Sequence, residues 1–210
     1  MTAEITFWDN IAERYAARPV QNMDAYEKTL ERVRSYIGPE HAVLEVGCGT
    51  GTTALKLAPH TGHTTATDFS PAMVAIGEAK ARDAGVTNVR FKALDAASPE
   101  FGKDGYDVVM GFNLLHLVKD VDGTLATLQR TLVKGGTLIT KTPCLEGWPF
   151  GLLRVALPVM RLFGKAPKGK LNFFRIADLE ARIERAGFRI IETGNYPASP
   201  PNRFVVATKL

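Results

Sequence analysis

Cysteine is nearly absent from this chain, and so are long apolar runs. The 210 residues include only two cysteines, Cys48 and Cys144, so the sequence implies no disulfide framework and fits a reducing compartment. No apolar run approaches the roughly 18 residues that suggest a membrane span. The first residues lack a basic region followed by an apolar core, so no signal peptide is predicted. Together these absences predict a cytoplasmic protein.

Acidic residues are missing from one stretch of an otherwise balanced chain. The net charge is only +4, and no acid occurs between Gly147 and Ala177. Aromatic and aliphatic residues alternate in this stretch with basic ones, which are Arg154, Arg161, Lys165, Lys168, Lys170 and Arg175. None of the four histidines has metal-ligand spacing with another histidine or a cysteine, so no metal site is predicted.

One short segment is the most informative feature of the chain. The nine residues from Val43 to Gly51 read VLEVGCGTG, an apolar run that contains an acid and ends in alternating glycines. This pattern predicts a buried strand, a tight turn and a helix start, the first unit of a nucleotide-binding α/β sheet. Glycines lack a Cβ atom, so Gly47, Gly49 and Gly51 let the backbone lie against a flat ligand. Asp68 ends the next predicted strand, where a carboxylate can accept the hydroxyl hydrogens of a ribose.

The spacing of the glycines distinguishes between cofactors. A dinucleotide fingerprint reads G-x-G-x-x-G and would place its third glycine at position 52, where this chain has Thr52. The observed G-x-G-x-G, preceded by Glu45, resembles motif I of the class I S-adenosylmethionine-dependent methyltransferases. An ordinary βα turn and an NAD site are the alternatives. The resemblance implies a methyltransferase that uses S-adenosyl-L-methionine and releases S-adenosyl-L-homocysteine.

Strands and helices are predicted to alternate along most of the chain. The predicted strands are 42–47, 63–68, 89–95, 106–112, 136–142, 188–194 and 203–208, and the predicted helices are 51–59, 71–84, 121–133 and 176–187, after two helices within 7–37. Alternation of this kind predicts a Rossmann-like, doubly wound α/β fold with a mostly parallel seven-stranded sheet. The segment between the last two strands is too short for a crossover, so these strands should be antiparallel.

The chain length and punctuation predict a single domain over residues 1–210, and the resemblance implies a methyltransferase domain divided as follows. Residues 1–40 should form an N-terminal helical lid, and residues 41–143 the cofactor-binding core. Residues 144–175 should be a cap insertion, followed by the final helix and strands in 176–210.

The resemblance also places cofactor contacts on this sequence. In the family, an acid after the third strand lies near the exocyclic amine of adenine, which points to Asp95 with Ala96 beside it. The N-terminal helices lie across the mouth of the site, so Tyr15 and Tyr26 either close over the ligand or cover the sheet edge. The full predicted cofactor set is Tyr15, Tyr26, Glu45, Gly47, Cys48, Gly49, Gly51, Asp68, Phe69, Met73, Asp95, Ala96 and Asn113.

His116 is the candidate catalytic residue, because it follows the fourth predicted strand in a region that often borders the acceptor. Its ordinary pKa near 6.5 suits proton abstraction; the alternative is that it packs beneath the next helix. A cysteine-nucleophile mechanism is disfavoured, because such enzymes carry a second Pro-Cys pair after the fourth strand. That place reads Asn113-Leu114-Leu115 here, so Cys144 is expected to line a pocket instead.

The acid-free stretch and Tyr26 supply the candidate acceptor contacts, which are Tyr26, Trp148, Arg154 and Arg161. An apolar, cationic cap predicts a small-molecule or lipid-like acceptor, such as a lipid or a long-chain quinone precursor, or a peripheral membrane contact. The alternative is that the aromatics pack the cap while the bases stay solvated. Nucleic acid is disfavoured because the rest of the chain is nearly balanced in charge. A cofactor-binding regulatory module without transferase activity and an RNA methyltransferase are the alternative functions.

Overall fold

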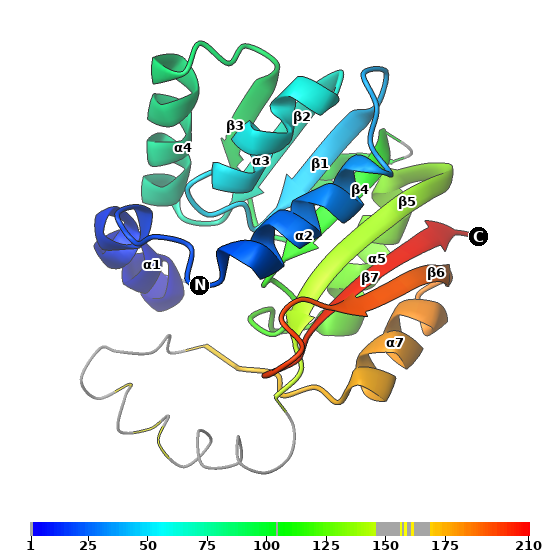
Figure 1. Ribbon diagram of the computed structural model, residues 1–210. Coiled ribbons are helices and arrows are strands. Elements are labelled where there is room, and N and C mark those ends of the chain that lie inside the picture. The colour runs from blue at the N-terminus through cyan, green and yellow to red at the C-terminus, as the bar shows by residue number, and fades with distance from the viewer. Residues whose placement is uncertain (1, 104, 146–155, 157, 159–160, 162–168) are drawn as a thin grey trace.

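The computed structural model describes residues 2–103, 105–145, 156, 158, 161 and 169–210 (Figure 1). Its helices are α1 (Thr2–Ala16), α2 (Met23–Arg34), α3 (Thr52–Leu57), α4 (Pro71–Asp83), α5 (Val121–Thr131) and α7 (Ile176–Arg185), with 3-10 helices η1 (Ala58–His60) and η2 (Pro99–Phe101). Its strands are β1 (Ala42–Val46), β2 (His63–Asp68), β3 (Val89–Ala93), β4 (Tyr106–Phe112), β5 (Leu132–Pro143), β6 (Phe188–Asn195) and β7 (Asn202–Lys209). Within these residues, no helix combines the length and the apolar character that crossing a membrane requires.

The seven strands form one sheet in the order β3-β2-β1-β4-β5-β7-β6. Neighbouring strands from β3 to β5 are parallel, whereas β7 runs antiparallel to both β5 and β6. The strand order changes direction between β1 and β4, so the loops after these two strands diverge and leave a crevice, the usual ligand site of an open α/β sheet. The predicted fold class, including the antiparallel last pair, is confirmed.

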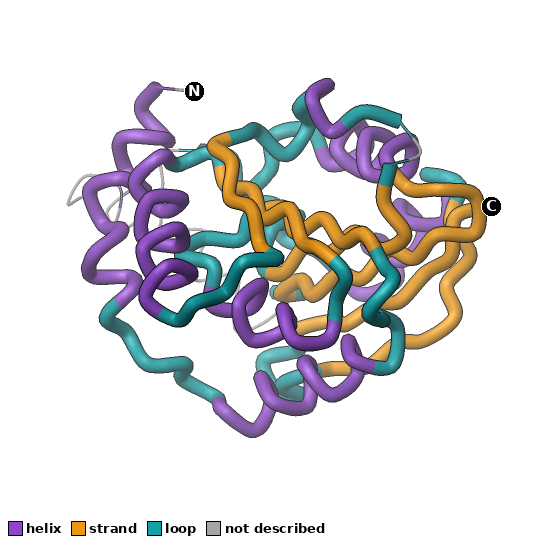
Figure 2. Tube along the Cα trace, turned by 90° about the horizontal axis from the view of Figure 1, so that it is seen from above, coloured by secondary structure: helices purple, strands orange, loops and turns teal. Residues whose placement is uncertain are grey.

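Helices lie on both faces of the sheet (Figure 2), and the side chains of the central strands alternate between these two layers. Val43 and Val108 pack with α2 and α3 on one face. Leu44 and Val109 pack with α5 and α7 on the other. All four are 0–1% exposed, because a central strand that is covered on both faces carries apolar residues at every position.

Side-chain caps fix where three helices begin. The Asn22 side chain accepts a hydrogen bond from the Ala25 N–H at the start of α2. Ser70 caps α4 and Asp120 caps α5 in the same way. Each cap satisfies an N–H that the helix itself leaves unpaired, which is typically worth about 1 kcal/mol. The caps of α4 and α5 lie at the edge of the sheet where the parallel strands end, so they help to order the loops at that edge.

Several predicted boundaries differ from those of the structure by one to five residues, and four of these differences are informative. The first helix begins at Thr2, five residues earlier than predicted, and the helix expected up to residue 37 ends at Arg34. Strand β3 ends at Ala93, so Asp95 lies in the loop beyond it. Strand β5 already begins at Leu132, and its pairing with β4 shifts between Tyr106 and Val108. The extra residues at this shift include Gly135 and Gly136, so the stretch between the helix predicted to end at 133 and the strand predicted to begin at 136 belongs to β5.

The predicted division of the chain into lid, core, cap and final elements remains a prediction. Residues 146–155, 157, 159–160 and 162–168, which make up most of the predicted cap, lie outside the described residues. The return segment from Gly169 to Phe174 is described and leads directly into α7.

Candidate active site

A cavity of about 1040 Å³ lies at the edge of the sheet where β1, β2 and β4 end. Its lining comes from α1, from the loops after β1, β2, β3 and β4, from α5 and from the return segment. Ten predicted site residues line it: Tyr15, Gly47, Gly49, Asp68, Phe69, Met73, Asp95, Ala96, Asn113 and His116. The structure therefore gathers residues from positions 15 to 116 around one space.

The glycine loop after β1 forms one wall of this cavity. Gly47 and Gly49 adopt φ angles of +70° and +54°, in the left-handed region that side chains rarely occupy. A Cβ atom on Gly47 would also stand only 2.8 Å from a methyl carbon of Leu114. Gly51 is different: it lies outside the cavity lining, and its Cβ would stand 2.5 Å from the Phe91 ring. The packing of β3 on α3 and α4 therefore requires the third glycine.

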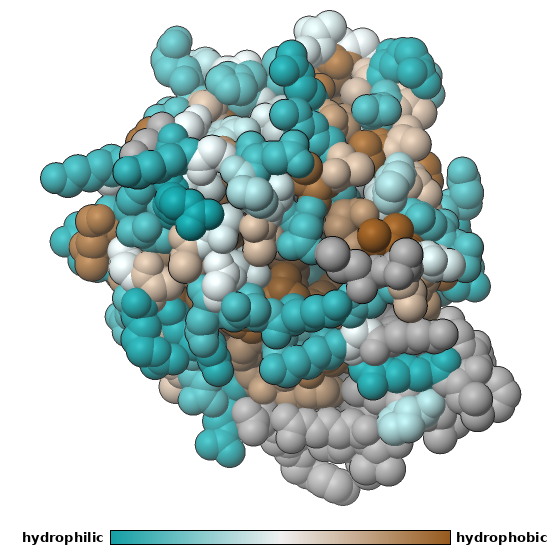
Figure 3. Space-filling model, turned by 180° about the vertical axis from the view of Figure 1, so that it is seen from behind, coloured by the Kyte–Doolittle hydropathy of each residue, from teal (hydrophilic) through white to brown (hydrophobic). Residues whose placement is uncertain are grey.

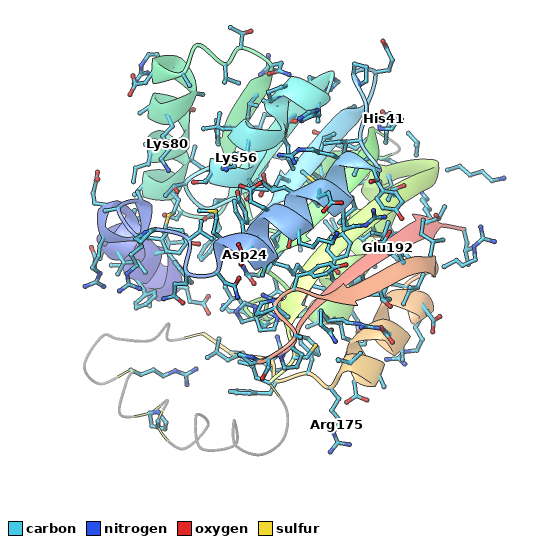
Figure 4. All side chains as sticks on the ribbon, in the orientation of Figure 1. Asp24, His41, Lys56, Lys80, Arg175 and Glu192 are labelled. Carbon is cyan, nitrogen blue, oxygen red and sulfur yellow. The ribbon has the colours of Figure 1, made fainter. Side chains whose placement is uncertain are left out.

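Two contacts from neighbouring elements hold this loop. The Asp68 carboxylate, at the end of β2, accepts hydrogen bonds from the backbone N–H groups of Gly49 and Ser70, both at 2.9 Å. The Lys80 ammonium, from α4, donates to the Thr50 hydroxyl at 3.0 Å and to the Thr50 carbonyl at 3.3 Å (Figure 4). Lys80 was not predicted, because no spacing in the sequence relates a residue near the end of α4 to the loop that precedes α3.

Two buried carboxyl groups lie beneath and beside the loop. Glu45 is 2% exposed, and burial, reinforced by the charge of Asp68, raises its pKa to about 8 even though a hydrogen bond from the Ala54 backbone lowers it. Its Oε2 atom has no hydrogen-bond partner among the described residues. Burial also raises the pKa of Asp68, against hydrogen bonds from Ser70 and Gly49. This end of the cavity is therefore acidic and well supplied with hydrogen-bond acceptors.

Helix α1 covers the same end. The Tyr15 ring lies 3.5 Å from where a Cβ of Gly49 would stand, and Trp8 packs edge-on against Tyr15 at 6.4 Å. The helix is held by Asp9, whose carboxylate accepts hydrogen bonds from the Ser70 hydroxyl at 2.6 Å and from a backbone N–H at the start of α4. Desolvation, and then the charges of the two buried carboxyl groups, raise the Tyr15 pKa. The Tyr15 hydroxyl is thus protonated and able to donate.

Three further predicted cofactor residues lie outside the lining. The Tyr26 hydroxyl is 3.2 Å from the Thr53 hydroxyl, and its ring packs on the core between α2 and the sheet. Cys48 is buried in the cluster formed by α3, α4 and β3, and Glu45 lies on β1 beneath the loop. Tyr26 thus joins α2 to α3, and its predicted contact with a ligand has no counterpart in the cavity lining.

Asn113 directly follows β4 in a strained but well-anchored conformation. Its φ of +53° makes it the one non-glycine residue with positive φ among those described, a conformation that asparagine tolerates better than most residues. Its backbone N–H donates to the Lys141 carbonyl at 2.7 Å, and its Oδ1 accepts from the Asn202 amide at 3.0 Å. Contacts from β5 and β7 therefore fix this residue at the cavity wall.

His116 lies further along the same loop and lines the cavity. Its Nδ1 atom is buried and has no hydrogen-bond partner among the described residues. Burial lowers the His116 pKa to about 4, so the imidazole is neutral at pH 7. A neutral imidazole can accept or donate one hydrogen bond at each nitrogen, and the low pKa makes it a weaker base than an ordinary histidine.

The side of the cavity around His116 is mainly apolar. Leu117, Val118, Pro143, Leu145, Leu171 and Phe173 line it. Cys144, which was expected to line a pocket, is 5% exposed and belongs to the core beneath. The expectation is wrong because successive residues of an extended chain point to opposite sides: its neighbours Pro143 and Leu145 reach the cavity.

The return segment forms the outer wall of this apolar side. The Asn172 backbone N–H donates to the His116 carbonyl at 2.8 Å, and its side-chain amide donates to the Val118 carbonyl at 2.7 Å and to the Leu115 carbonyl at 3.3 Å. Three hydrogen bonds therefore connect the segment before α7 to the turn after β4. No motif marks Asn172 in the sequence, because its partners are backbone carbonyls more than fifty residues away.

The predicted acceptor residues of the cap are only partly described. Trp148 and Arg154 lie outside the described residues. The Arg161 guanidinium donates a hydrogen bond to the Gly169 carbonyl at the start of the return segment. Sequence reasoning also missed Glu4 of α1 and Lys119 of the loop after β4, which both line the cavity and form an ion pair at 3.2 Å.

The sequence is similar to known methyltransferases. Residues 43–136 match the family described as "Methyltransferase domain". The uncharacterized methyltransferase YcgJ of Bacillus subtilis is 32% identical over 100 residues, 48% of this chain and 40% of that protein. A demethylmenaquinone methyltransferase of Listeria welshimeri is 33% identical over 130 residues, 59% of this chain and 55% of that protein. The chain thus spans about half the length of these curated relatives.

The fold is similar to solved methyltransferase structures. The complex between the Haloferax volcanii Trm112 methyltransferase activator and a methyltransferase contains a chain that superposes with a TM-score of 0.79 at 16% identity, covering 96% of each chain. At this identity the likeness concerns the fold alone. Together with the family match, it confirms the resemblance that the glycine loop implied.

Proposed function

We propose that this protein transfers a methyl group from S-adenosylmethionine to a small-molecule or lipid-like acceptor, and the match of residues 43–136 to the family described as "Methyltransferase domain" supports this. One observation carries the proposal. A single cavity joins an acidic, glycine-walled end to a mainly apolar side, and the loop after β4 borders both parts.

The residues at the acidic end fit the cofactor. Asp68 uses each carboxylate oxygen for one backbone N–H, and a carboxylate offers about four acceptor sites, so it can still accept ribose hydroxyls. The bare backbone of Gly47 and Gly49 leaves space for the cofactor's flat parts. Glu45, beneath the loop, offers a further hydrogen-bonding group, because its Oε2 atom has no partner among the described residues. NAD fits less well, because no basic side chain among the described lining residues lies at this end to meet its phosphates.

When bound, S-adenosylmethionine supplies an activated methyl group on a sulfonium, so the protein's main task is orientation. Correct placement of two reactants can lower the activation barrier by roughly 7–11 kcal/mol. Asn113 and His116 lie on the loop that separates the two parts of the cavity. We assign Asn113 to positioning at this junction, with His116 the candidate group that accepts or orients the acceptor's proton.

The apolar side supports an apolar acceptor. Its lining carries leucine, valine, proline and phenylalanine side chains, and such a surface binds apolar rings or chains through the area it removes from water. The Listeria relative, by its name, methylates demethylmenaquinone. An acceptor of related character, with an apolar body, fits this side of the cavity.

Calorimetry on the purified protein tests the cofactor assignment. S-adenosylmethionine and S-adenosylhomocysteine should both bind, and NAD should give no heat at the same concentration. Turnover is then tested with radiolabelled methyl donor and a panel of apolar acceptors. Binding of both sulfur compounds without methyl transfer to any acceptor would favour the regulatory module over the enzyme, and tighter binding of NAD would contradict the family's cofactor.

A further inference from the structure

We propose that the acceptor carries an acidic group, which Lys170 recognises at the rim of the apolar side of the cavity. The inference rests on the proposed function and names its substrate class, an apolar molecule with one anionic group such as a carboxylate. Lys170 stands out when the partners of the ionised residues that line the cavity are compared.

The first two of these residues neutralise each other. Glu4 of α1 and Lys119 of the loop after β4 form an ion pair at 3.2 Å. The same pairing raises the Lys119 pKa, so the lysine stays charged and engaged. Neither residue leaves an unmatched charge for a ligand.

Two aspartates are engaged by the backbone. The Asp120 carboxylate accepts from the Gly123 N–H at 2.9 Å as the cap of α5. The Asp95 carboxylate accepts from the Ala97 N–H at 2.9 Å. Both hold turns in place, and Asp68 belongs to the cofactor end. His116, which burial keeps neutral, adds no charge to the apolar side.

Lys170 is the remaining ionised residue of the described lining, and it has no hydrogen-bond or ion-pair partner among the described residues. Its sequence neighbours cannot supply one, since no acid occurs between Gly147 and Ala177. Arg175, in the same stretch, points away from the fold (Figure 4), so it does not compete for the same ligand.

A second, smaller cavity lies behind this rim, and its two arginines are matched in number by two acids. It measures about 430 Å³ and shares the wall Lys170–Phe173 with the main cavity. Arg182 and Arg185 line its other side, against one acid, Asp178. Arg182 is engaged by Asp122 at 2.6 Å. Seen from behind, the molecule shows hydrophilic side chains with hydrophobic patches between them (Figure 3).

The position of Lys170 relative to the reaction site is fixed by its neighbour two residues on. Asn172 is hydrogen-bonded to the turn that carries His116, so the backbone at Lys170 is held beside the apolar side. An acceptor whose apolar body lies against Leu171 and Phe173 would extend an acidic group to the rim, while its reactive atom faces His116.

The charge at the rim is exposed, which limits its effect. Exposed ion pairs are screened by water and are worth up to about 1 kcal/mol, or roughly fivefold in affinity. Lys170 should therefore act as a selector of acceptors rather than as the main source of affinity, which comes from the apolar wall.

A matched pair of probes tests the proposal. 2-Naphthoate and 2-naphthol share the same ring system, but only the first is an anion at pH 7. Their dissociation constants are measured by calorimetry at low salt with saturating S-adenosylhomocysteine. Wild-type protein should bind the naphthoate about fivefold more tightly than the naphthol. Lys170→Gln should bind both equally. Lys134→Gln, which removes an exposed lysine at the far end of β5, should keep the wild-type preference.

The outcomes separate this proposal from the function on which it rests. Equal binding of the two probes by wild-type protein, a preference that survives Lys170→Gln, or no binding of either probe while S-adenosylhomocysteine binds would each overturn the role of Lys170. Co-sedimentation with phosphatidylglycerol vesicles that Lys170→Gln abolishes would also overturn it, because the lysine would then face a membrane surface. Failure of S-adenosylhomocysteine to bind at all would instead contradict the proposed function.

Discussion

At the scale of single residues, the glycine loop contains residues whose location the sequence pattern predicts and others whose location depends on packing. The spacing of Gly47, Gly49 and Asp68 predicted their neighbourhood, because a strand, a turn and the next strand are close in the chain and fix one another locally. Gly51 belongs to the same pattern, yet it lies against Phe91 instead of the cavity. Tyr26 likewise pairs with Thr53. Those roles depend on how distant elements pack, which no local spacing encodes.

Asp68 gives the first prediction at this scale. Replacing Asp68 with Ala should weaken S-adenosylmethionine binding by about 1.5–3 kcal/mol, since it removes hydrogen bonds that involve a charged group. The free energy of unfolding should fall as well, because the Gly49 and Ser70 N–H groups lose their acceptor. Calorimetry and denaturant titration measure the two effects. Asp83→Ala, at the exposed end of α4, is the control, and unchanged affinity in Asp68→Ala would show that the ribose lies elsewhere.

Glu45 gives a pH-dependent prediction. A carboxyl group whose pKa is higher in the folded than in the unfolded protein binds more protons when folded, so the free energy of unfolding falls as pH rises. For Glu45 the fall should extend from its ordinary pKa of 4.5 to about 8. Each pKa unit corresponds to about 1.36 kcal/mol. Glu45→Gln should flatten this pH dependence, as measured by denaturant titration of the cofactor-free protein at pH 5.5 and 8. If the free energy of unfolding depended on pH identically in wild type and variant, the raised pKa of the buried Glu45 carboxyl would be contradicted.

At the scale of elements, the sequence predicted the sheet well and the contacts between layers poorly. The periods of strands and helices, together with turn glycines, are local signals, and every predicted strand has a counterpart within a few residues of its predicted bounds. The connection of the return segment to the turn after β4 is different in kind. The Asn172 side chain donates to backbone carbonyls. Every residue has a backbone carbonyl, so no sequence pattern identifies these partners.

Asn172 therefore allows a test of the outer wall. Asn172→Ala should release the return segment from the turn that carries His116 and lower kcat/KM for the acceptor roughly tenfold, because small displacements of reactants are costly. The Kd for S-adenosylmethionine should stay unchanged, since the glycine loop is untouched. Asn88→Ala is a matched control: Asn88 also donates to two backbone carbonyls, of Ala58 and Thr61. Equal effects of both variants on acceptor kinetics would show that only stability is involved.

Helix α1 gives the second prediction at this scale. Asp9→Ala removes the acceptor of the Ser70 hydroxyl and of a backbone N–H at the start of α4, two bonds worth about 0.5–1.5 kcal/mol each. The helix should then cover the cofactor less firmly, with weaker S-adenosylmethionine binding and a change in Trp8 fluorescence. Glu13→Ala, an exposed acid of the same helix, should change neither. If Asp9→Ala bound the cofactor as tightly as wild type, α1 would be a structural cover only.

At the scale of the whole molecule, the sheet order explains why a site assembled from distant parts of the chain is coherent. Parallel strands β1, β2, β3 and β4 all end at one edge, so the residues that follow them meet there whatever their separation in sequence. Helix α1 and the return segment then close the space from two sides. The cofactor should consequently contact several elements at once and stabilise them together.

This coupling predicts a thermal shift of the whole protein. A ligand that binds only the folded state at 100 times its Kd adds about 2.7 kcal/mol of stability, and for 150–250 residues each kcal/mol raises Tm by about 2–4 °C. S-adenosylhomocysteine at that concentration should therefore raise Tm by roughly 5–10 °C, measured by calorimetry or dye fluorescence. NAD at the same concentration should leave Tm unchanged, because the glycine spacing and the lining of the acidic end do not suit its phosphates. The same concentration of S-adenosylhomocysteine should shift Asp68→Ala much less. An equal shift with NAD would mean that the loop binds nucleotides in general, and the assignment of the cofactor would then be wrong.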